Sequence, residues 1–133
     1  MSKVGQRGKF AESEVRKWMA KRSDAEARFW FYRYPDPRAG SLQPVPADFG
    51  ATHCGTPYLI EVKEITLPPA RATRRVPEKN FSADKVARMA KFEMAGGIGW
   101  VVVCFMPIKE WRLVPLGVFT KRQPSWDVSA WPA

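Results

Sequence analysis

Histidine and cysteine are scarce in this sequence. Its 133 residues include one histidine, His53, and two cysteines, Cys54 and Cys104, which form no Cys-x-x-Cys pair. Structural zinc sites and Cys/His catalytic pairs need such residues in clusters, so neither kind of site is expected. Cys104 lies in an apolar run, which indicates a buried core thiol. We expect no disulfide and a reducing cytoplasm, which would be the host cytoplasm for a viral protein.

Long hydrophobic runs are also missing. A helix that crosses a bilayer needs about 20 mostly apolar residues, and the longest apolar run here is far shorter. The sequence starts with polar and basic residues rather than with the apolar segment of a signal peptide. We therefore expect no membrane partner, and no motif for a small-molecule cofactor is apparent.

Acidic residues are few relative to basic ones. Thirteen aspartates and glutamates face 22 lysines and arginines, which gives a formal charge of +9. A small domain this basic usually binds a polyanion, and nucleic acid is the first choice. Hydrophobic residues make up 45% of the chain, enough for a packed core, and the length predicts a single domain spanning 1–133.

The order of the expected elements indicates an α/β fold. A basic lead (1–9) precedes a helix, and a proline-rich arm (35–46) and a tail with tryptophans and prolines (123–133) flank the later elements. Ser82 is predicted to be a helix N-cap, and Gly96-Gly97 is predicted to end the same helix. The tail is expected either to fray or to dock on a partner. The expected helices span 10–27 and 83–95, and the expected strands span 28–34, 47–51, 58–65, 98–106 and 111–114.

The first helix carries one apolar stripe with an acid on each side. The stripe consists of Ala11, Val15, Trp18, Met19 and Arg22 at helical spacing. Glu12 and Glu14 flank it, and either acid could face a neighbouring strand. Periodicity alone does not choose between them.

A candidate catalytic group lies on the strands that follow. Alternate residues of a strand point to the same face, so Glu61 and Lys63 project together. A hairpin with a loop containing Gly55 and Pro57 would bring Asp48 beside them. Two carboxylates and an ammonium at one sheet edge suit a divalent-metal nuclease. An acid-x-Lys triplet alone is more often a solvated face.

Basic residues surround this group in the sequence. They would supply the field that draws a phosphate backbone toward a cluster of acids. We expect contacts with DNA from the lead, from the arm and from the run after the third strand: Arg7, Lys9, Arg33, Arg38, Arg71, Arg74, Arg75 and Lys79.

The ordered motifs resemble those of the PD-(D/E)xK nuclease superfamily, and within it the Holliday-junction resolvases of the RecU type. The likeness spans most of the chain from Gly8 to Trp111. It rests on Arg7-Gly8-Lys9-Phe10-Ala11-Glu12, Ala47-Asp48-Phe49-Gly50, Ile60-Glu61-Val62-Lys63-Glu64, Val76-Pro77-Glu78-Lys79-Asn80-Phe81, and Gly96-Gly97 to Phe105.

The resemblance implies a restriction-endonuclease-like core, α-β-β-β-α-β, with a central mixed sheet flanked by helices. It implies that Asp48, Glu61 and the carbonyl of Val62 bind Mg²⁺ or Mn²⁺, and that Glu12 rather than Glu14 completes the cluster. Lys63 would orient the attacking water or stabilise the pentavalent phosphorane. The implied activity is Mg²⁺-dependent resolution of four-way DNA junctions by paired nicks, carried out by a homodimer.

Two features depart from those relatives. Lys85 stands where many of them have glutamine, and a lysine there could contact phosphate. The arm at 35–46 is shorter than the stalk that they insert into the junction. Two other functions therefore stay open: a restriction-like or repair endonuclease on duplex or branched DNA, and a basic DNA-binding module without catalysis.

Overall fold

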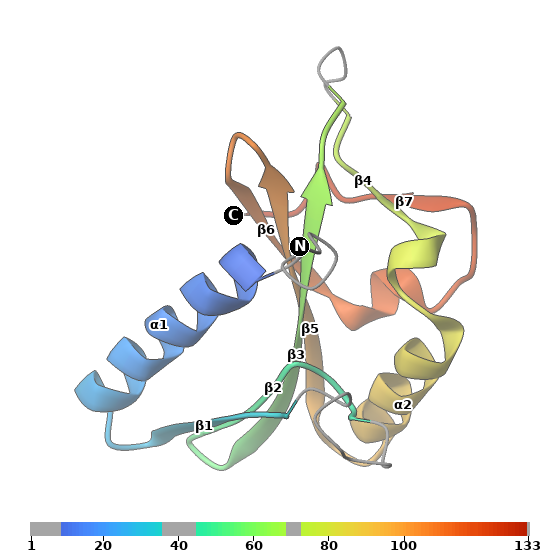
Figure 1. The fold of residues 1–133 in the computed structure, drawn as a ribbon. Coiled ribbons are helices and arrows are strands. Elements are labelled where there is room, and N and C mark those ends of the chain that lie inside the picture. Colours follow the sequence, from blue (N-terminus) through green and yellow to red (C-terminus); the bar gives the residue numbers. More distant parts are fainter. Residues whose placement is uncertain (1–8, 36–44, 69–72, 133) are drawn as a thin grey trace.

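A five-stranded mixed sheet forms the centre of the structure, a computed structural model that describes residues 9–35, 45–68 and 73–132 (Figure 1). The strand order is β1-β2-β3-β5-β6; β3 and β5 run parallel and the other neighbours antiparallel. A second sheet pairs β4 with β7. The elements are α1 (Lys9–Ala25), β1 (Phe29–Arg33), β2 (Phe49–His53), β3 (Thr56–Thr66), β4 (Arg75–Pro77), η3 (Glu78–Asn80), α2 (Ala83–Met94), β5 (Ile98–Met106), β6 (Glu110–Pro115), η4 (Leu116–Phe119) and β7 (Ser125–Asp127).

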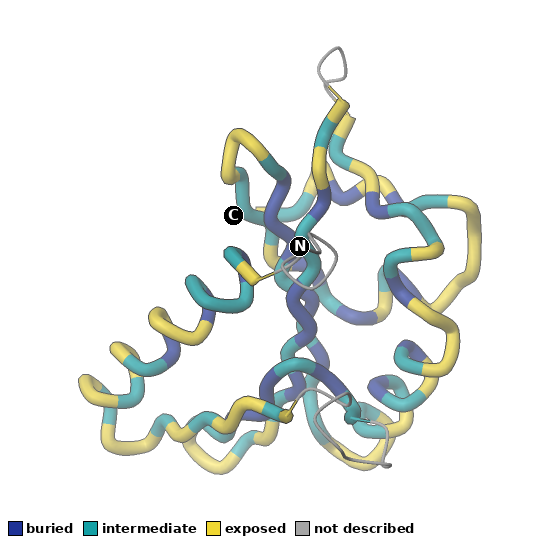
Figure 2. The backbone as a smooth tube through the Cα atoms, in the orientation of Figure 1, coloured by how far each residue is buried: buried dark blue, intermediate teal, exposed yellow. Residues whose placement is uncertain are grey.

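The two helices lie on opposite faces of the sheet (Figure 1). On one face, α1 packs Ala11, Val15 and Met19 against side chains from β2, β3 and β5. On the other face, α2 and the segment around β7 enclose a larger core that is buried from solvent (Figure 2). Each helix thus covers one side of the sheet, as the predicted α/β fold requires.

The hairpin of β2 and β3 is tighter than predicted. Its loop is only Cys54-Gly55, with φ of 51° and 87°, because a two-residue hairpin turn needs left-handed residues to match the strand twist. Pro57, which we expected in the loop, lies inside β3 opposite Thr52. The strand that follows is eleven residues long, which extends it beyond the predicted range at both ends.

Helix α2 begins and ends where the sequence predicts. The Ser82 side chain accepts a hydrogen bond from the backbone N–H of Lys85 at 3.2 Å, so it is the N-cap. Phe81 and Val86 are both buried in the same core. Gly96, just past the helix, has a φ of +109°, a conformation that glycine adopts without strain.

The stripe predicted on α1 is partly wrong. Ala11, Val15 and Met19 are buried, but Trp18 is 57% exposed and Arg22 is also exposed. Positions 18 and 22 lie one residue before and three after Met19, so they turn toward the edge of the helix's packing face rather than its centre. Trp18 is therefore a surface tryptophan.

The expectation for the tail is also wrong. Trp126 is 1% exposed and Val128 is fully buried, both within the core that α2 covers. β7 pairs with β4, and neither strand is among those that the sequence predicted. The tail thus packs against the core of its own chain instead of fraying or docking on a partner. None of the described helices has the length and apolar character needed to span a bilayer.

Candidate active site

Asp48 and Glu61 face each other at the point where β2 and β3 start to pair. Phe49 is opposite Ile60 in the antiparallel register, so one further step brings Asp48 opposite Glu61. Asp48 Oδ2 accepts a hydrogen bond from the Val62 backbone N–H at 2.8 Å, which fixes the carboxylate against β3. The Glu61 side chain is 2% exposed, although a buried carboxylate is costly without partners.

Two lysines reach the same oxygen of Glu61. Lys63 Nζ lies 2.9 Å from Oε2, and Lys85 Nζ, on the first turn of α2, lies 3.3 Å from it. The Lys63 ammonium also stands over the Phe81 ring, 4.9 Å from its centroid. Within the described part of the chain, the other oxygen of Glu61, Oε1, is buried without a hydrogen-bond donor.

The acids at this edge repel one another. The pKa of Asp48 is raised to about 7, first by burial, then by the negative charge of Glu61 and, to a smaller extent, that of Glu12. The hydrogen bond from Val62 and the charge of Lys85 act in the opposite direction. A carboxyl whose pKa is shifted this far by burial and by neighbouring acids marks a candidate functional site.

Glu12 reaches this edge from α1. Its Oε1 accepts from Arg33 Nη2 at 3.0 Å, a contact that spans from α1 to β1. Glu14 instead lies beside Lys17, at 3.4 Å, and lines a different surface. Glu12 is therefore the helix acid whose charge acts on Asp48.

Glu64 fastens the start of α1 to the sheet, a role that the sequence analysis did not identify. Its Oε1 accepts from the Ala11 backbone N–H at 3.0 Å, one of the free donors of the first helical turn. Glu64 follows Lys63 and so points to the opposite face of β3, toward α1. The alternation of side chains along β3 could have predicted this role, because it points the Glu64 carboxylate toward the N-terminus of α1, the positive end of the helix.

The donors present fit a hard divalent cation. Asp48 and Glu61 supply carboxylate oxygens, the ligands that Mg²⁺ prefers, and the unpaired Oε1 of Glu61 is an acceptor that a cation would satisfy. Over residues 9–35, 45–68 and 73–132, no three side chains of His, Cys, Asp or Glu converge as a ready-made metal cluster. Glu12 is held by Arg33 and would join the two acids only after leaving that pair.

Several predicted DNA-contacting residues are engaged within the chain. Arg74 binds Glu110 through Nε and Nη2, at 2.8 and 3.1 Å. Arg75 Nε donates to Ser125 Oγ at 2.7 Å. Lys9 and Lys79 are exposed. Arg7, Arg38 and Arg71, and most of the arm at 35–46, lie outside the described residues.

The fold is shared with a solved structure. No family model and no curated protein matches the sequence. Among solved structures, Archaeoglobus fulgidus Hjc, described as a Holliday junction resolvase from an archaeal hyperthermophile, matches with a TM-score of 0.61 and 23% identity, over 94% of this chain and 92% of that one. The predicted restriction-endonuclease-like fold, a mixed sheet flanked by helices, is confirmed.

Proposed function

We propose that this protein is a Mg²⁺-dependent endodeoxyribonuclease of the PD-(D/E)xK type, similar to RecU-like resolvases, that resolves four-way DNA junctions. The observation that carries the proposal is a pair of neighbouring acids, Asp48 and Glu61, in which the charge of Glu61 raises the pKa of Asp48. The ammonium of Lys63 lies 2.9 Å from the Glu61 carboxylate. This group sits in a fold shared with a protein described as a junction resolvase. Both cysteines are free, which suits the expected reducing cytoplasm.

Each site residue has a distinct role in this proposal. Asp48, Glu61 and the Val62 carbonyl hold Mg²⁺ or Mn²⁺, and Glu12 completes the set once it leaves Arg33. The metal supplies a Lewis acid that offsets charge growing on the phosphoryl group. Lys63, oriented by Glu61 and by the Phe81 ring, aligns the attacking water or a phosphate oxygen.

Basic residues around the acids let DNA approach them. Lys9 and Lys79 are exposed and available to phosphates, whereas Arg33 and Lys85 are paired with Glu12 and Glu61 and would reach phosphates at the entrance from those positions. The proposal also assigns contacts with DNA to Arg74 and Arg75, which would have to leave Glu110 and Ser125, and to Arg7, Arg38 and Arg71, which lie outside the described residues. A four-way junction has two-fold symmetry, and a C2 homodimer presents two equivalent sites for paired nicks.

The test compares DNA substrates in Mg²⁺ for the wild-type protein and an Asp48→Asn variant. Symmetrical nicks in a labelled four-way junction, absent from duplex and flap and lost in the variant, are expected. Cutting of linear duplex or flap would favour the restriction-like or repair endonuclease instead. Binding without cleavage, in either Mg²⁺ or Mn²⁺, would leave only the non-catalytic DNA-binding module.

Replacing Lys85 by Gln is expected to tighten metal binding about threefold to tenfold. The Lys85 ammonium lies 3.3 Å from Glu61 Oε2, so a cation arriving at this carboxylate meets a like charge that glutamine lacks. Calorimetric titration of the DNA-free protein with Mn²⁺ measures the change. Lys91→Gln, which removes an exposed lysine from the last turn of the same helix, is the control. Equal affinities in the two variants would contradict this role for Lys85.

A further inference from the structure

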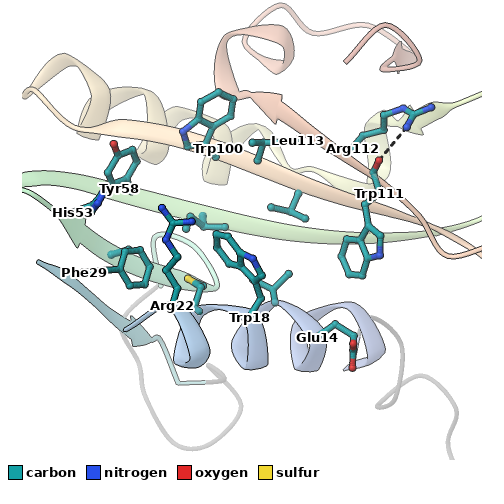
Figure 3. Close-up of a pocket in the computed structure, with 15 residues that line it drawn as sticks. Glu14, Trp18, Arg22, Phe29, His53, Tyr58, Trp100, Trp111, Arg112 and Leu113 are labelled. Carbon is teal, nitrogen blue, oxygen red and sulfur yellow. Dashed lines mark hydrogen bonds between the residues drawn. The ribbon is translucent and has the colours of Figure 1, made fainter. Parts of the chain in front are cut away.

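An apolar groove of about 550 Å³ lies between α1 and the sheet, away from the acids (Figure 3). Its floor includes Trp100 from β5 with Trp111 and Leu113 from β6. Sheets with parallel strands normally have both faces covered, because the strands carry apolar residues on both sides. Here α1 covers β2, β3 and part of β5, and the groove marks where that cover ends.

The helix side of the groove carries a short, ordered stripe. Glu14, Trp18 and Arg22 all line the groove and follow one another at intervals of four residues (Figure 3). Residues four apart lie on the same face of a helix, and eight residues span about 12 Å along its axis. Trp18, 57% exposed, therefore stands midway between an acid and a base.

This order is self-complementary about a two-fold axis. If two α1 helices meet antiparallel with the axis near Trp18, Glu14 of each copy lies opposite Arg22 of the partner subunit. A C2 interface requires that one patch match itself in this way. We propose that the groove and this stripe form the interface between two copies of the chain, with Trp18 packing against the partner at the centre.

The composition of the surface favours a second copy over other occupants. Tryptophan and arginine are enriched at protein–protein interfaces and their hot spots, and the groove contains Trp18, Trp100 and Trp111 together with Arg22 and Arg112. Both signs of charge are present at its rim, which matches a copy of itself better than a uniformly charged ligand.

Glu14 and Arg22 already have partners within their own chain, but these contacts compete only weakly with pairs across the proposed interface. Glu14 meets Lys17 at 3.4 Å on the helix surface, and Arg22 meets Glu26, just past the end of α1, at 2.5 Å, where Glu26 also contacts His53. Exposed pairs of this kind contribute little stability, so they exchange readily for pairs across an interface. Arg22 also lies over the Trp18 ring, 5.7 Å from its centroid, which keeps base and tryptophan in one patch.

This inference rests on the homodimer of the proposed function and names the surface through which its two copies pair. Helix α1 belongs both to this surface and to the candidate active site. The same helix carries Glu12 near Asp48 and has its first turn fastened to β3 by Glu64. Pairing through α1 would therefore fix the separation of the two sites. Self-association needs neither metal nor cleavage, so the two proposals can fail separately.

Sedimentation equilibrium of the full chain in EDTA tests the interface through charge reversal. The wild type is expected to be dimeric at about 100 μM, a concentration that populates any dimer of micromolar Kd. Glu14→Arg places two cations opposite each other, and Arg22→Glu places two acids opposite each other. Each change should raise the dimer Kd about tenfold or more, and the double variant should return it to within about threefold of wild type.

Lys21→Glu is the matched control, because it makes the same charge change at an exposed position of α1 outside the groove. Its dimer Kd should stay close to that of wild type, and circular dichroism checks that every variant is folded. A monomeric wild type, single variants that dimerise normally, or a double variant without rescue would each overturn the interface. A dimer that cuts no DNA would leave this inference standing while the nuclease proposal fails, and cleavage by a monomer would do the reverse.

Discussion

Replacing Asp48 by Asn is expected to stabilise the metal-free protein at pH 8 by about 2 to 4 kcal/mol, even though it removes a proposed metal ligand. The pKa of Asp48 is raised to about 7 in the folded protein, mainly by burial, against an ordinary value of 3.8. At pH 8 the folded chain must therefore hold a charge that its surroundings disfavour. Asparagine has no such charge, and its amide oxygen can still accept the Val62 N–H bond.

The sign follows from proton linkage. Between about pH 4 and pH 7 the folded state keeps the Asp48 proton that the unfolded state has lost, so the free energy of unfolding falls as pH rises through this window. The contribution of Asp48 to the free energy of unfolding is fully present below the pKa that Asp48 has in the unfolded chain. It is lost above the pKa that Asp48 has in the folded protein. The Asn variant should lack this part of the pH dependence.

Urea unfolding in EDTA at pH 5 and pH 8 measures the effect. Wild type should lose stability between the two pH values, and the variant should lose much less. Asp24→Asn, at an exposed position of α1, should behave like wild type. Mg²⁺ should restore stability at pH 8 to wild type but not to the Asp48 variant, because a ligand that binds only the folded state stabilises it. Identical pH profiles for the wild type and the Asp48 variant would contradict the coupling.

Local signals in the sequence predicted most of the elements. The positions of α2 and β5 could be predicted from the Ser82 cap, the glycines after α2 and the apolar run of β5. Each of these signals depends only on neighbouring residues. Alternation along β3 put Glu61 and Lys63 on one face, and the hairpin register brought Asp48 opposite Glu61. These are short-range consequences of strand geometry.

Long-range pairings were the part that the sequence could not predict. Arg74 and Arg75 looked like free cations, yet their partners Glu110 and Ser125 are 36 and 50 residues away. Trp18 shares the helical spacing of core residues but lies where the sheet no longer covers α1. Periodicity predicts which face of a helix is apolar. How much of that face the sheet covers depends on the tertiary structure.

Replacing Trp126 by Ala is expected to lower the free energy of unfolding by about 3 to 5 kcal/mol, the cost of emptying a large buried site. The indole is 1% exposed, and its Nε1 donates to the Lys121 carbonyl at 2.9 Å. Urea unfolding checks the change. Trp131→Ala, at a partly exposed position of the same tail, should cost about 1 kcal/mol. A Trp126→Ala loss no larger than that of the control would mean that the tail is not part of the core.

The same substitution should reach the candidate site through a row of aromatic rings. Trp126 meets Phe119 with centroids 5.0 Å apart, Phe119 meets Phe81 at 5.2 Å, and Lys63 stands over the Phe81 ring at 4.9 Å. The cavity left by alanine removes the support of Phe119, so Phe81 should hold Lys63 less firmly against Glu61. Trp126→Phe, which keeps a ring in the row, should retain more activity than Trp126→Ala at a temperature where both are folded. Equal activity of the two folded variants would show that the tail stabilises the core without positioning Lys63.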